Sequence, residues 1–238
     1  DKGYVGHKAA KLMKRAKSIE QRKENAVTEK SRLLKNAETF EELKLSPAVY
    51  HSDRLITLPQ VSVSYGAADV FPPVSFSVYR GDRIALNGGN GSGKSSLLKL
   101  IMGEDIPHTG TLTLGSGLLI SYVPQDASFL SGSLNSFEEQ YSLNAVLFRA
   151  VLQKMGFEKQ MYDKDLSELS DGQKKKVLIA KSLCEKAHLY IWDEPLNFLD
   201  IYCRIQIEDL ITEYKPTMIF VEHDRAFRDR IATKIIEL

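Results

Sequence analysis

The stretch Leu86-Asn-Gly-Gly-Asn-Gly-Ser-Gly-Lys-Ser-Ser96 decides the fold of this chain, because it fits the phosphate-loop pattern G-x-x-x-x-G-K-[ST]. Residues 83–86 before it predict a strand, and residues 95–102 after it predict the helix that the loop opens. Glycines allow backbone N–H groups to surround an anion, and the helix N-terminus adds roughly half a positive charge. The loop residues expected to bind a nucleotide are Asn87, Gly88, Gly89, Asn90, Gly91, Ser92, Gly93, Lys94, Ser95 and Ser96.

Two carboxylates end a second apolar stretch, residues 188–192, at Asp193 and Glu194. A magnesium nucleotide needs such a pair opposite the phosphate loop. Asp193 would hold Mg²⁺ together with Ser95, and Glu194 would orient or deprotonate the attacking water. Lys94 would reach the β- and γ-phosphates. An Asp-Glu pair after a strand is by itself typical of a solvated loop, but the phosphate loop favours the catalytic interpretation with ATP and Mg²⁺.

The composition limits the class of protein. A chain of 238 residues can form one large domain or two small ones. The net charge of +1 hides an asymmetry, since residues 1–36 carry 11 Lys or Arg and 4 Asp or Glu, and the remainder is acidic. Cys184 and Cys203 form no C-x-x-C pair, which argues against a disulfide framework or a zinc site. No apolar run approaches the ~18 residues of a membrane span, and the expectation is a cytoplasmic protein without a membrane partner.

The basic N-terminal part predicts one long helix. Residues 8–36 contain no Pro or Gly and are rich in Lys, Glu, Ala and Leu. A seam of apolar residues recurs every seven positions at Leu12, Ile19, Ala26 and Leu33. So thin a seam needs a partner helix, and residues 1–50 therefore read as the second half of a helical hairpin. The alternative is a solvated amphipathic helix folded back on its own domain, and the positive charge could serve RNA phosphates or only solubility.

The rest of the chain, residues 51–238, predicts an α/β domain with a mostly parallel sheet that binds nucleotide at the carboxyl ends of its strands. A helical subdomain is expected over about residues 126–186, with breaks at Gly156 and at residues 169–172. Strands and helices alternate elsewhere. Strands are expected at residues 55–64, 74–78, 83–86, 110–114, 118–123, 189–192, 217–221 and 234–238, and helices at 202–214 and 225–231.

At Leu169-Ser-Asp-Gly-Gln173 the chain resembles the signature sequence of ABC-type ATPases, which lies in that family between the phosphate loop and the acidic strand. The resemblance implies an ABC nucleotide-binding fold with an antiparallel β subdomain and a helical signature subdomain. It also implies that Ser170, Gly172 and Gln173 complete the nucleotide site of an opposed domain, so that an isolated domain hydrolyses ATP slowly.

Four further residues match positions of the same family. Tyr65 is similar to the aromatic that stacks on adenine, and Gln125 to the lid glutamine that senses Mg²⁺ and the attacking water. Asp200 is similar to the carboxylate that follows the acidic strand, and His223 to the switch histidine that contacts the γ-phosphate. In isolation, Tyr65 would be interpreted as a core aromatic, Gln125 as a loop residue and His223 as a surface histidine.

One position departs from the family pattern, because Asp171 stands where glycine is common. A carboxylate in the first turn of a helix is favourable by a few tenths to about 1 kcal/mol. It would also face the γ-phosphate of the opposed site, which puts turnover of that site in doubt.

The helical arm before the nucleotide domain resembles the linker of ABC-F proteins, which join two nucleotide domains and act on the ribosome. Residues 2–18 and the signature with Asp171 are most similar to the antibiotic-resistance type, the Lsa and Vga proteins. The resemblance implies a missing first nucleotide domain, ribosomal RNA and tRNA as partners of the basic linker, and protection against drugs of the large subunit. An isolated fragment could also pair with itself as a homodimer. The alternatives are the ATPase of an ABC transporter and a nucleotide-dependent scaffold with vestigial hydrolysis.

Overall fold

A five-stranded parallel sheet is built around the strand that leads into the phosphate loop. The strand order is β10 (Lys234–Glu237), β4 (Arg83–Asn87), β9 (Met218–Val221), β8 (Leu189–Asp193) and β7 (Ile120–Val123), and all four pairings are parallel. Every residue of β8 and β9 is buried, as expected for strands covered on both faces. Because the strands are parallel, the phosphate loop after β4, the acidic pair ending β8 and the loop after β9 meet at one edge.

A second sheet is antiparallel, as the family resemblance implied. Its long strand β1 (Arg54–Tyr65) pairs with β3 (Val74–Tyr79) and with three two-residue strands, which are β2 (Ala68–Asp69), β5 (His108–Thr109) and β6 (Thr113–Leu114). The expected single strand over residues 110–114 is therefore wrong. Gly110 has a left-handed φ of 74°, and a Cβ on it would lie 2.1 Å from the Gln60 carbonyl oxygen. Gly110 lies between two short strands, because β5 ends before it at Thr109 and β6, the part of the expected range that is a strand, begins at Thr113.

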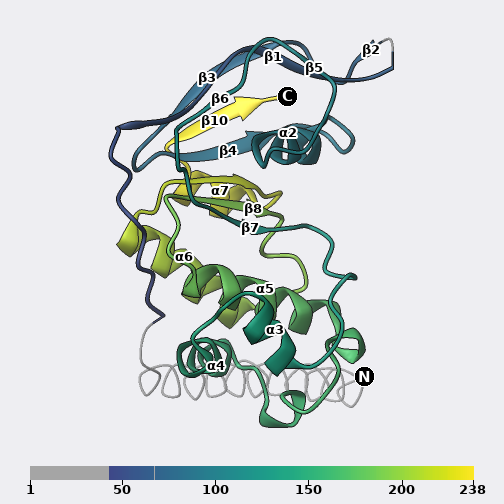
Figure 1. The fold of residues 1–238 in the computed structure, drawn as a ribbon, viewed down its shortest axis with the longest axis vertical. Helices are drawn as coiled ribbons and strands as arrows, with labels where there is room; N and C mark the ends of the chain where they lie inside the picture. The colour runs from purple at the N-terminus through teal and green to yellow at the C-terminus, as the bar shows by residue number, and fades with distance from the viewer. Residues whose placement is uncertain (1–42, 67) are drawn as a thin grey trace, which may run out of the picture. The chain divides into compact units, whose positions relative to one another are not determined.

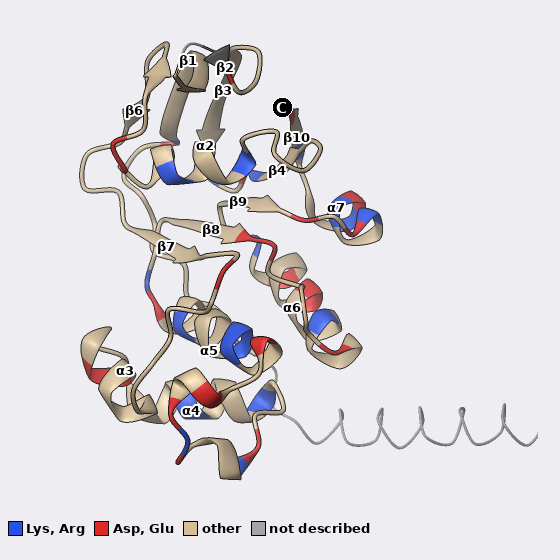
Figure 2. Ribbon diagram, turned by 90° about the vertical axis from the view of Figure 1, so that its right-hand side faces the viewer, with Lys and Arg blue, Asp and Glu red and all other residues tan. Residues whose placement is uncertain are grey.

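Helix α2 (Lys94–Ile101) lies between the two sheets, as both ribbon views show (Figures 1 and 2). Its apolar residues Leu97, Leu98, Leu100 and Ile101 are buried in one cluster with side chains of β1, β4 and β8. The phosphate loop is thus held from both sides, because the sheet that precedes it and the helix that follows it share this core.

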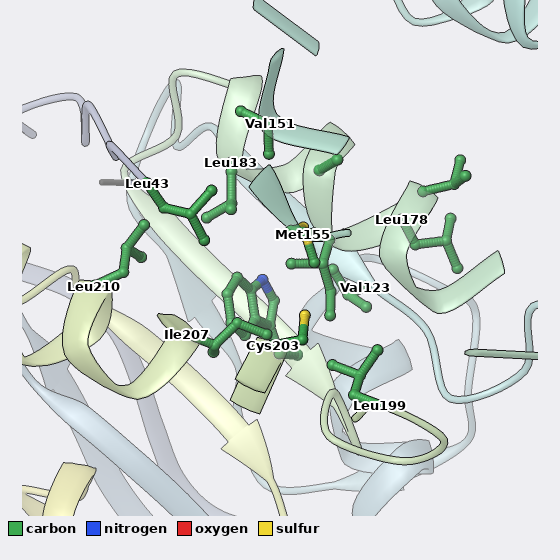
Figure 3. Close-up of a cluster of buried hydrophobic side chains, with 14 of the residues drawn as sticks. Leu43, Val123, Val151, Met155, Leu178, Leu183, Leu199, Cys203, Ile207 and Leu210 are labelled. Atoms are coloured by element: carbon green, nitrogen blue, oxygen red, sulfur yellow. The ribbon is translucent and has the colours of Figure 1, made fainter. Parts of the chain in front are cut away.

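The helical subdomain contains α3 (Leu134–Gln140), α4 (Ala145–Lys154) and α5 (Asp171–Cys184). Two 3-10 turns, η1 (Lys159–Met161) and η2 (Leu166–Glu168), separate α4 from α5, so both expected breaks are present. A further break falls before α4, where the Asn144 side chain accepts the N–H of Leu147 as an N-cap. Leu43, Val151, Met155 and Leu183 pack with side chains of α6 (Ile201–Tyr214) in one core (Figure 3).

The computed structural model describes residues 43–66 and 68–238. The long helix expected over residues 8–36 lies outside them. Residues 43–50, which the sequence grouped with the linker, have no helix and bury Leu43, Leu45 and Tyr50 in the unit Leu43–Leu238. Within the described residues, no helix combines the length and the apolar character that crossing a membrane requires. The strands and helices beyond residue 51 confirm the α/β class and the mostly parallel sheet with its helical subdomain.

Candidate active site

A cavity of about 500 Å³ lies over the N-terminus of α2. Residues from four separate segments line it, and the sequence expected all but Val70 to bind or act on a nucleotide. They are Tyr65, Val70, Asn90, Gly91, Ser92, Gly93, Lys94, Ser95, Ser96, Gln125 and Glu194. The phosphate loop, the aromatic, the lid glutamine and the second carboxylate therefore converge on one space.

The phosphate loop has backbone that only glycine accepts easily. Gly93 caps α2 with a φ of 88°, and a Cβ on it would lie 2.7 Å from the Phe71 ring. Lys94, 8% exposed, donates from its ammonium to the carbonyls of Gly88 at 2.9 Å and Gly89 at 2.8 Å. These bonds fold the loop around the ammonium. The backbone N–H groups of the loop remain available at the helix N-terminus.

Asp193 is the deepest carboxylate of the site, with 1% of its surface exposed at the end of β8. Burial raises the pKa of Asp193, although a hydrogen bond from Ser95 and the positive charges of Lys175 and Lys94 act to lower it. One of its oxygens, Oδ1, is buried without a hydrogen-bond partner. An unpaired buried carboxylate oxygen is costly, and a cation would satisfy it.

Ser95 and Gln125, which line the first cavity, also line an adjoining one of about 570 Å³ together with Asp193. The three expected magnesium ligands thus come together. The described residues contain no cluster of three or more His, Cys, Asp or Glu suited to a metal. In nucleotide sites Mg²⁺ is commonly bound by one or two carboxylates together with the substrate phosphates, and Asp193 offers one such carboxylate.

Glu194 and His223 form a pair across neighbouring strand ends. Nε2 of His223 lies 3.1 Å from Oε1 of Glu194, and the Asn197 amide donates to Oε2. Glu194 has a left-handed φ of 49° and donates its N–H to the Val221 carbonyl. Such strained backbone is typical of active sites. The carboxylate is held at both oxygens and still reaches the cavity.

Sequence reasoning missed Glu222, whose side chain is 5% exposed. Its carboxylate accepts the backbone N–H groups of His223 at 2.8 Å, Asp224 at 3.2 Å and Leu196 at 3.2 Å. One side chain thus joins the loop of His223 to the turn that follows Glu194. The only sequence signal was a carboxylate directly after an apolar strand, beside the histidine.

The signature residues do not line the cavity. Ser170 and Gln173 form a capping box at the start of α5, with the Ser170 N–H donating to Oε1 of Gln173 at 2.9 Å. Gly172 is needed for packing, because a Cβ there would lie 2.5 Å from the Phe198 carbonyl oxygen.

Asp200 lies beside the signature helix and also outside the cavity. It caps α6 through the Cys203 N–H at 2.9 Å and pairs with the Lys176 ammonium at 2.8 Å. Burial would raise the pKa of Asp200, but these two partners lower it below its usual value. The aspartate thereby ties α6 to α5.

Tyr65 and Asn87 complete the expected set. Tyr65 is 60% exposed at the end of β1 and donates its hydroxyl to the Ser96 hydroxyl at 3.0 Å. An exposed ring at the mouth of the cavity suits stacking on a base. Asn87 instead donates to the Glu237 carboxylate at 2.8 Å and accepts from Arg228 at 2.7 Å, so its side chain serves the sheet edge.

Comparisons with known proteins show the family of the chain. A protein-family model described as "ABC transporter" matches residues 71–197. The ATP-binding protein Uup of Caulobacter vibrioides is 32% identical over 194 residues, which cover 78% of this chain and 32% of that protein. ABC transporter F family member 2 of Arabidopsis thaliana is 33% identical over 190 residues, which cover 77% of this chain and 28% of that protein. The energy-dependent translational throttle protein EttA of Escherichia coli K12 is 30% identical over 204 residues, which cover 82% of this chain and 37% of that protein.

Solved structures share the fold. An ATP-binding subunit of an ABC transporter superposes with a TM-score of 0.67 at 24% identity, over 77% of this chain and 85% of that one. The chain spans about a third of the length of the curated relatives it matches. With the family model covering more than half of its residues, the chain belongs to the ABC transporter family of ATP-binding proteins, and its relatives include members of the ABC-F group.

Proposed function

We propose that this chain is an ATP-hydrolysing nucleotide domain of a longer ABC-F protein that acts on the ribosome in the cytoplasm. One observation carries the catalytic part of the proposal. Lys94, Gln125 and Glu194 line the phosphate-loop cavity, and His223 contacts Glu194. The adjoining cavity is lined by Asp193, which has a buried oxygen without a hydrogen-bond partner.

In this proposal each side chain has a separate task in hydrolysis. Lys94 and the loop N–H groups bind the β- and γ-phosphates, and Tyr65 stacks on the base. Ser95, Gln125 and Asp193 would hold Mg²⁺, which when bound supplies charge neutralisation at the phosphates. Glu194 accepts a proton from the water that attacks the γ-phosphorus. The bond from the γ-phosphorus to the bridging oxygen breaks, which yields ADP and phosphate.

His223 would contact the γ-phosphate and keep Glu194 aligned. For the 3.1 Å contact to be a hydrogen bond, Nε2 of His223 must carry the proton and Oε1 of Glu194 must accept it. The Asn197 amide occupies the other oxygen. The carboxylate is thereby oriented before substrate binds, which reduces the reorganisation needed during the reaction.

The site is proposed to be complete only when two nucleotide domains face each other. Ser170, Gly172, Gln173 and Asp200 lie outside the cavity of their own domain, which supports a role at an opposed one. The first nucleotide domain of a longer chain is the proposed partner, in line with the share of the relatives that this chain spans. A second copy of the chain could take that place in an isolated fragment. We therefore expect the isolated chain to bind MgATP and to turn it over slowly.

Action on the ribosome is supported by two features. EttA, 30% identical to this chain, is named a translational throttle protein, and residues 1–36 carry a strong excess of positive charge. A basic linker suits rRNA and tRNA phosphates. The resemblance of residues 2–18 and of the signature with Asp171 to Lsa and Vga proteins further supports protection against lincosamides, streptogramin A and pleuromutilins.

Co-sedimentation of the longer protein with ribosomes tests the proposal. With ATP, the Glu194→Gln variant should remain in the ribosomal pellet. The logarithm of the ribosome-binding constant should fall linearly with the logarithm of the salt concentration. Deletion of residues 1–36 should abolish the association and leave ATP affinity unchanged. If the truncated protein still co-sediments, the ribosomal proposal is wrong and an ATPase subunit of a transporter is favoured. ATP-dependent binding that Glu194→Gln does not alter would indicate a scaffold with vestigial hydrolysis.

A further inference from the structure

Lys175 is a buried cation at the centre of the nucleotide domain that the catalytic scheme above does not use. It lies in the second turn of α5 and is 1% exposed. Its ammonium donates to the main-chain carbonyl oxygens of Pro124 at 2.9 Å and Gln125 at 3.0 Å. A third, longer contact of 3.5 Å reaches the carbonyl oxygen of Asp193. All three acceptors are backbone atoms, so the lysine holds chain segments and forms no direct ion pair.

The surroundings of Lys175 match the needs of a buried ammonium. The group has three donors and no acceptor, and the three carbonyls can satisfy all of its donors. Burial lowers the pKa of Lys175, while the charges of Asp193, Glu194, Glu222 and Asp126 act in the opposite direction. Replacing a buried charge by an apolar side chain of similar size is often neutral or stabilising. Stability alone therefore gives no reason for a lysine at this position.

The carbonyls that Lys175 contacts belong to the ends of two neighbouring strands. β7 and β8 are parallel, with Val123 opposite Trp192, so Pro124 and Asp193 leave the sheet side by side. Gln125 follows directly. The side chains of Gln125 and Asp193 line the same cavity beside Ser95. The spacing of the two backbones determines whether these side chains can reach one ion.

We propose that Lys175 is a positioning residue, which fixes the main chain of Gln125 relative to that of Asp193 so that both side chains reach one Mg²⁺. The same ammonium ties this arrangement to α5, the helix that the signature residue Ser170 caps. A movement of the Gln125 loop would thus be passed to the signature helix. The inference rests on the proposed function, because it presumes that the site binds MgATP.

The neighbouring lysines of α5 have different partners, which makes one of them a matched control. Lys181 is also buried, at 8% exposure, but its ammonium pairs with Glu185 at 2.8 Å. It contacts none of the three carbonyls that Lys175 holds. Lys181 also lines the cavity that Ser95, Gln125 and Asp193 share. Lys181→Met therefore removes a buried positive charge from the same helix and the same cavity wall, but it removes no hydrogen bond to the carbonyls of Pro124, Gln125 or Asp193.

The test measures ATP affinity of the 238-residue chain by calorimetry, once with Mg²⁺ and once with EDTA. The wild-type chain and Lys181→Met should bind ATP more tightly with Mg²⁺. In Lys175→Met this gain should shrink by about 10-fold, the usual effect of losing a support behind a metal ligand. Affinity in EDTA should stay unchanged. Lys175→Gln, which keeps two donors, should lose less of the gain.

The outcomes separate this inference from the proposed function. If the wild-type chain shows no gain from Mg²⁺, the magnesium site fails and the role of Lys175 fails with it. If the wild-type chain shows the gain and Lys175→Met keeps it in full, only the role of Lys175 is overturned. If affinity falls by the same factor with Mg²⁺ and with EDTA, Lys175 is merely structural. Should Lys175→Met not fold, the same comparison on Lys175→Gln decides.

Discussion

Nε2 of His223 lies 3.1 Å from Oε1 of Glu194, although the two residues follow different strands of the sheet. β8 and β9 are parallel neighbours with Asp193 opposite Val221, so each side chain leaves its strand at the same edge. The contact needs the left-handed backbone of Glu194, whose N–H donates to the Val221 carbonyl at 3.0 Å. This pairing supports the proposed role of Glu194, because it fixes the orientation of the carboxylate that would accept a proton from water.

The first prediction concerns the general base. Glu194→Gln keeps the shape of the side chain but removes its ability to take a proton, so hydrolysis should fall by about 100-fold or more. ATP affinity should be retained, because Lys94 and the loop N–H groups carry phosphate binding. Phosphate release by the longer protein measures the first quantity, and equilibrium dialysis with labelled ATP measures the second.

Glu213→Gln, at an exposed position of α6, is the control for this substitution and should hydrolyse ATP at the wild-type rate. The proposed longer protein would have a second nucleotide site, and that site must be silenced first. Unchanged turnover in Glu194→Gln under these conditions would assign the base to another residue.

The second prediction concerns Glu222. Glu222→Ala would leave the backbone N–H groups of His223, Asp224 and Leu196 without their acceptor. Of these donors only Leu196 belongs to a buried residue, and an unsatisfied buried donor costs about 1–3 kcal/mol, so the free energy of unfolding should drop by about that amount. Urea unfolding followed by circular dichroism measures the loss. Glu222→Gln keeps one acceptor oxygen and should lose less, and a Glu222→Ala chain as stable as wild type would contradict the role assigned to this carboxylate.

The agreement between sequence and structure is best where the signal is local. The phosphate loop predicted its own strand and helix, because glycines, an apolar run and a helix start all lie within residues 83–102. The features that were missed depend on distant backbone. The backbone of Gln60 lies close to Gly110, and only residues 113–114 of the strand expected at 110–114 are a strand. Lys175 binds carbonyls about 50 positions earlier in the chain. A lysine in a charged run is typical of a solvated face, and only the tertiary fold reveals its burial.

The third prediction links function to stability at Asp193. Burial raises the pKa of Asp193, which means that its charge is disfavoured in the folded chain. Asp193→Asn removes that charge and should raise the melting temperature without Mg²⁺, by about 2–4 °C for each kcal/mol of relief. The same change should abolish the gain in ATP affinity that Mg²⁺ provides. A lower melting temperature in EDTA would show that the buried carboxylate is stabilising by itself.

The fourth prediction is a pH dependence at Asp200. Its pKa is lowered from 3.8 in the folded chain, so the stabilisation is present above pH 3.8 and is lost as the pH falls through the lower folded value. Asp200→Asn should keep the N-cap of α6, since Asn caps as well as Asp, but lose the pair with Lys176. With the aspartate half-exposed, the loss should be at most about 1 kcal/mol at pH 7. Unfolding of both chains at pH 7 and pH 3 checks whether the difference becomes smaller in acid, and a constant difference would contradict the charge pairing.

The fifth prediction concerns Asp171, the signature residue that departs from the family pattern. It lies in the first turn of α5, where a carboxylate stabilises the helix by about 0.3–1 kcal/mol. Asp171→Gly should therefore lower the stability of the chain by about 1–2 kcal/mol, because glycine is also a poor helix former. In the longer protein the same change should raise turnover at the opposed nucleotide site, since a negative charge facing the γ-phosphate is removed. Asp171→Asn separates the two effects, because it removes the charge and keeps a side chain in the helix. If Asp171→Asn and Asp171→Gly both leave turnover at the wild-type rate while the expected loss of stability is seen, the aspartate serves the helix alone and the opposed site does not feel its charge.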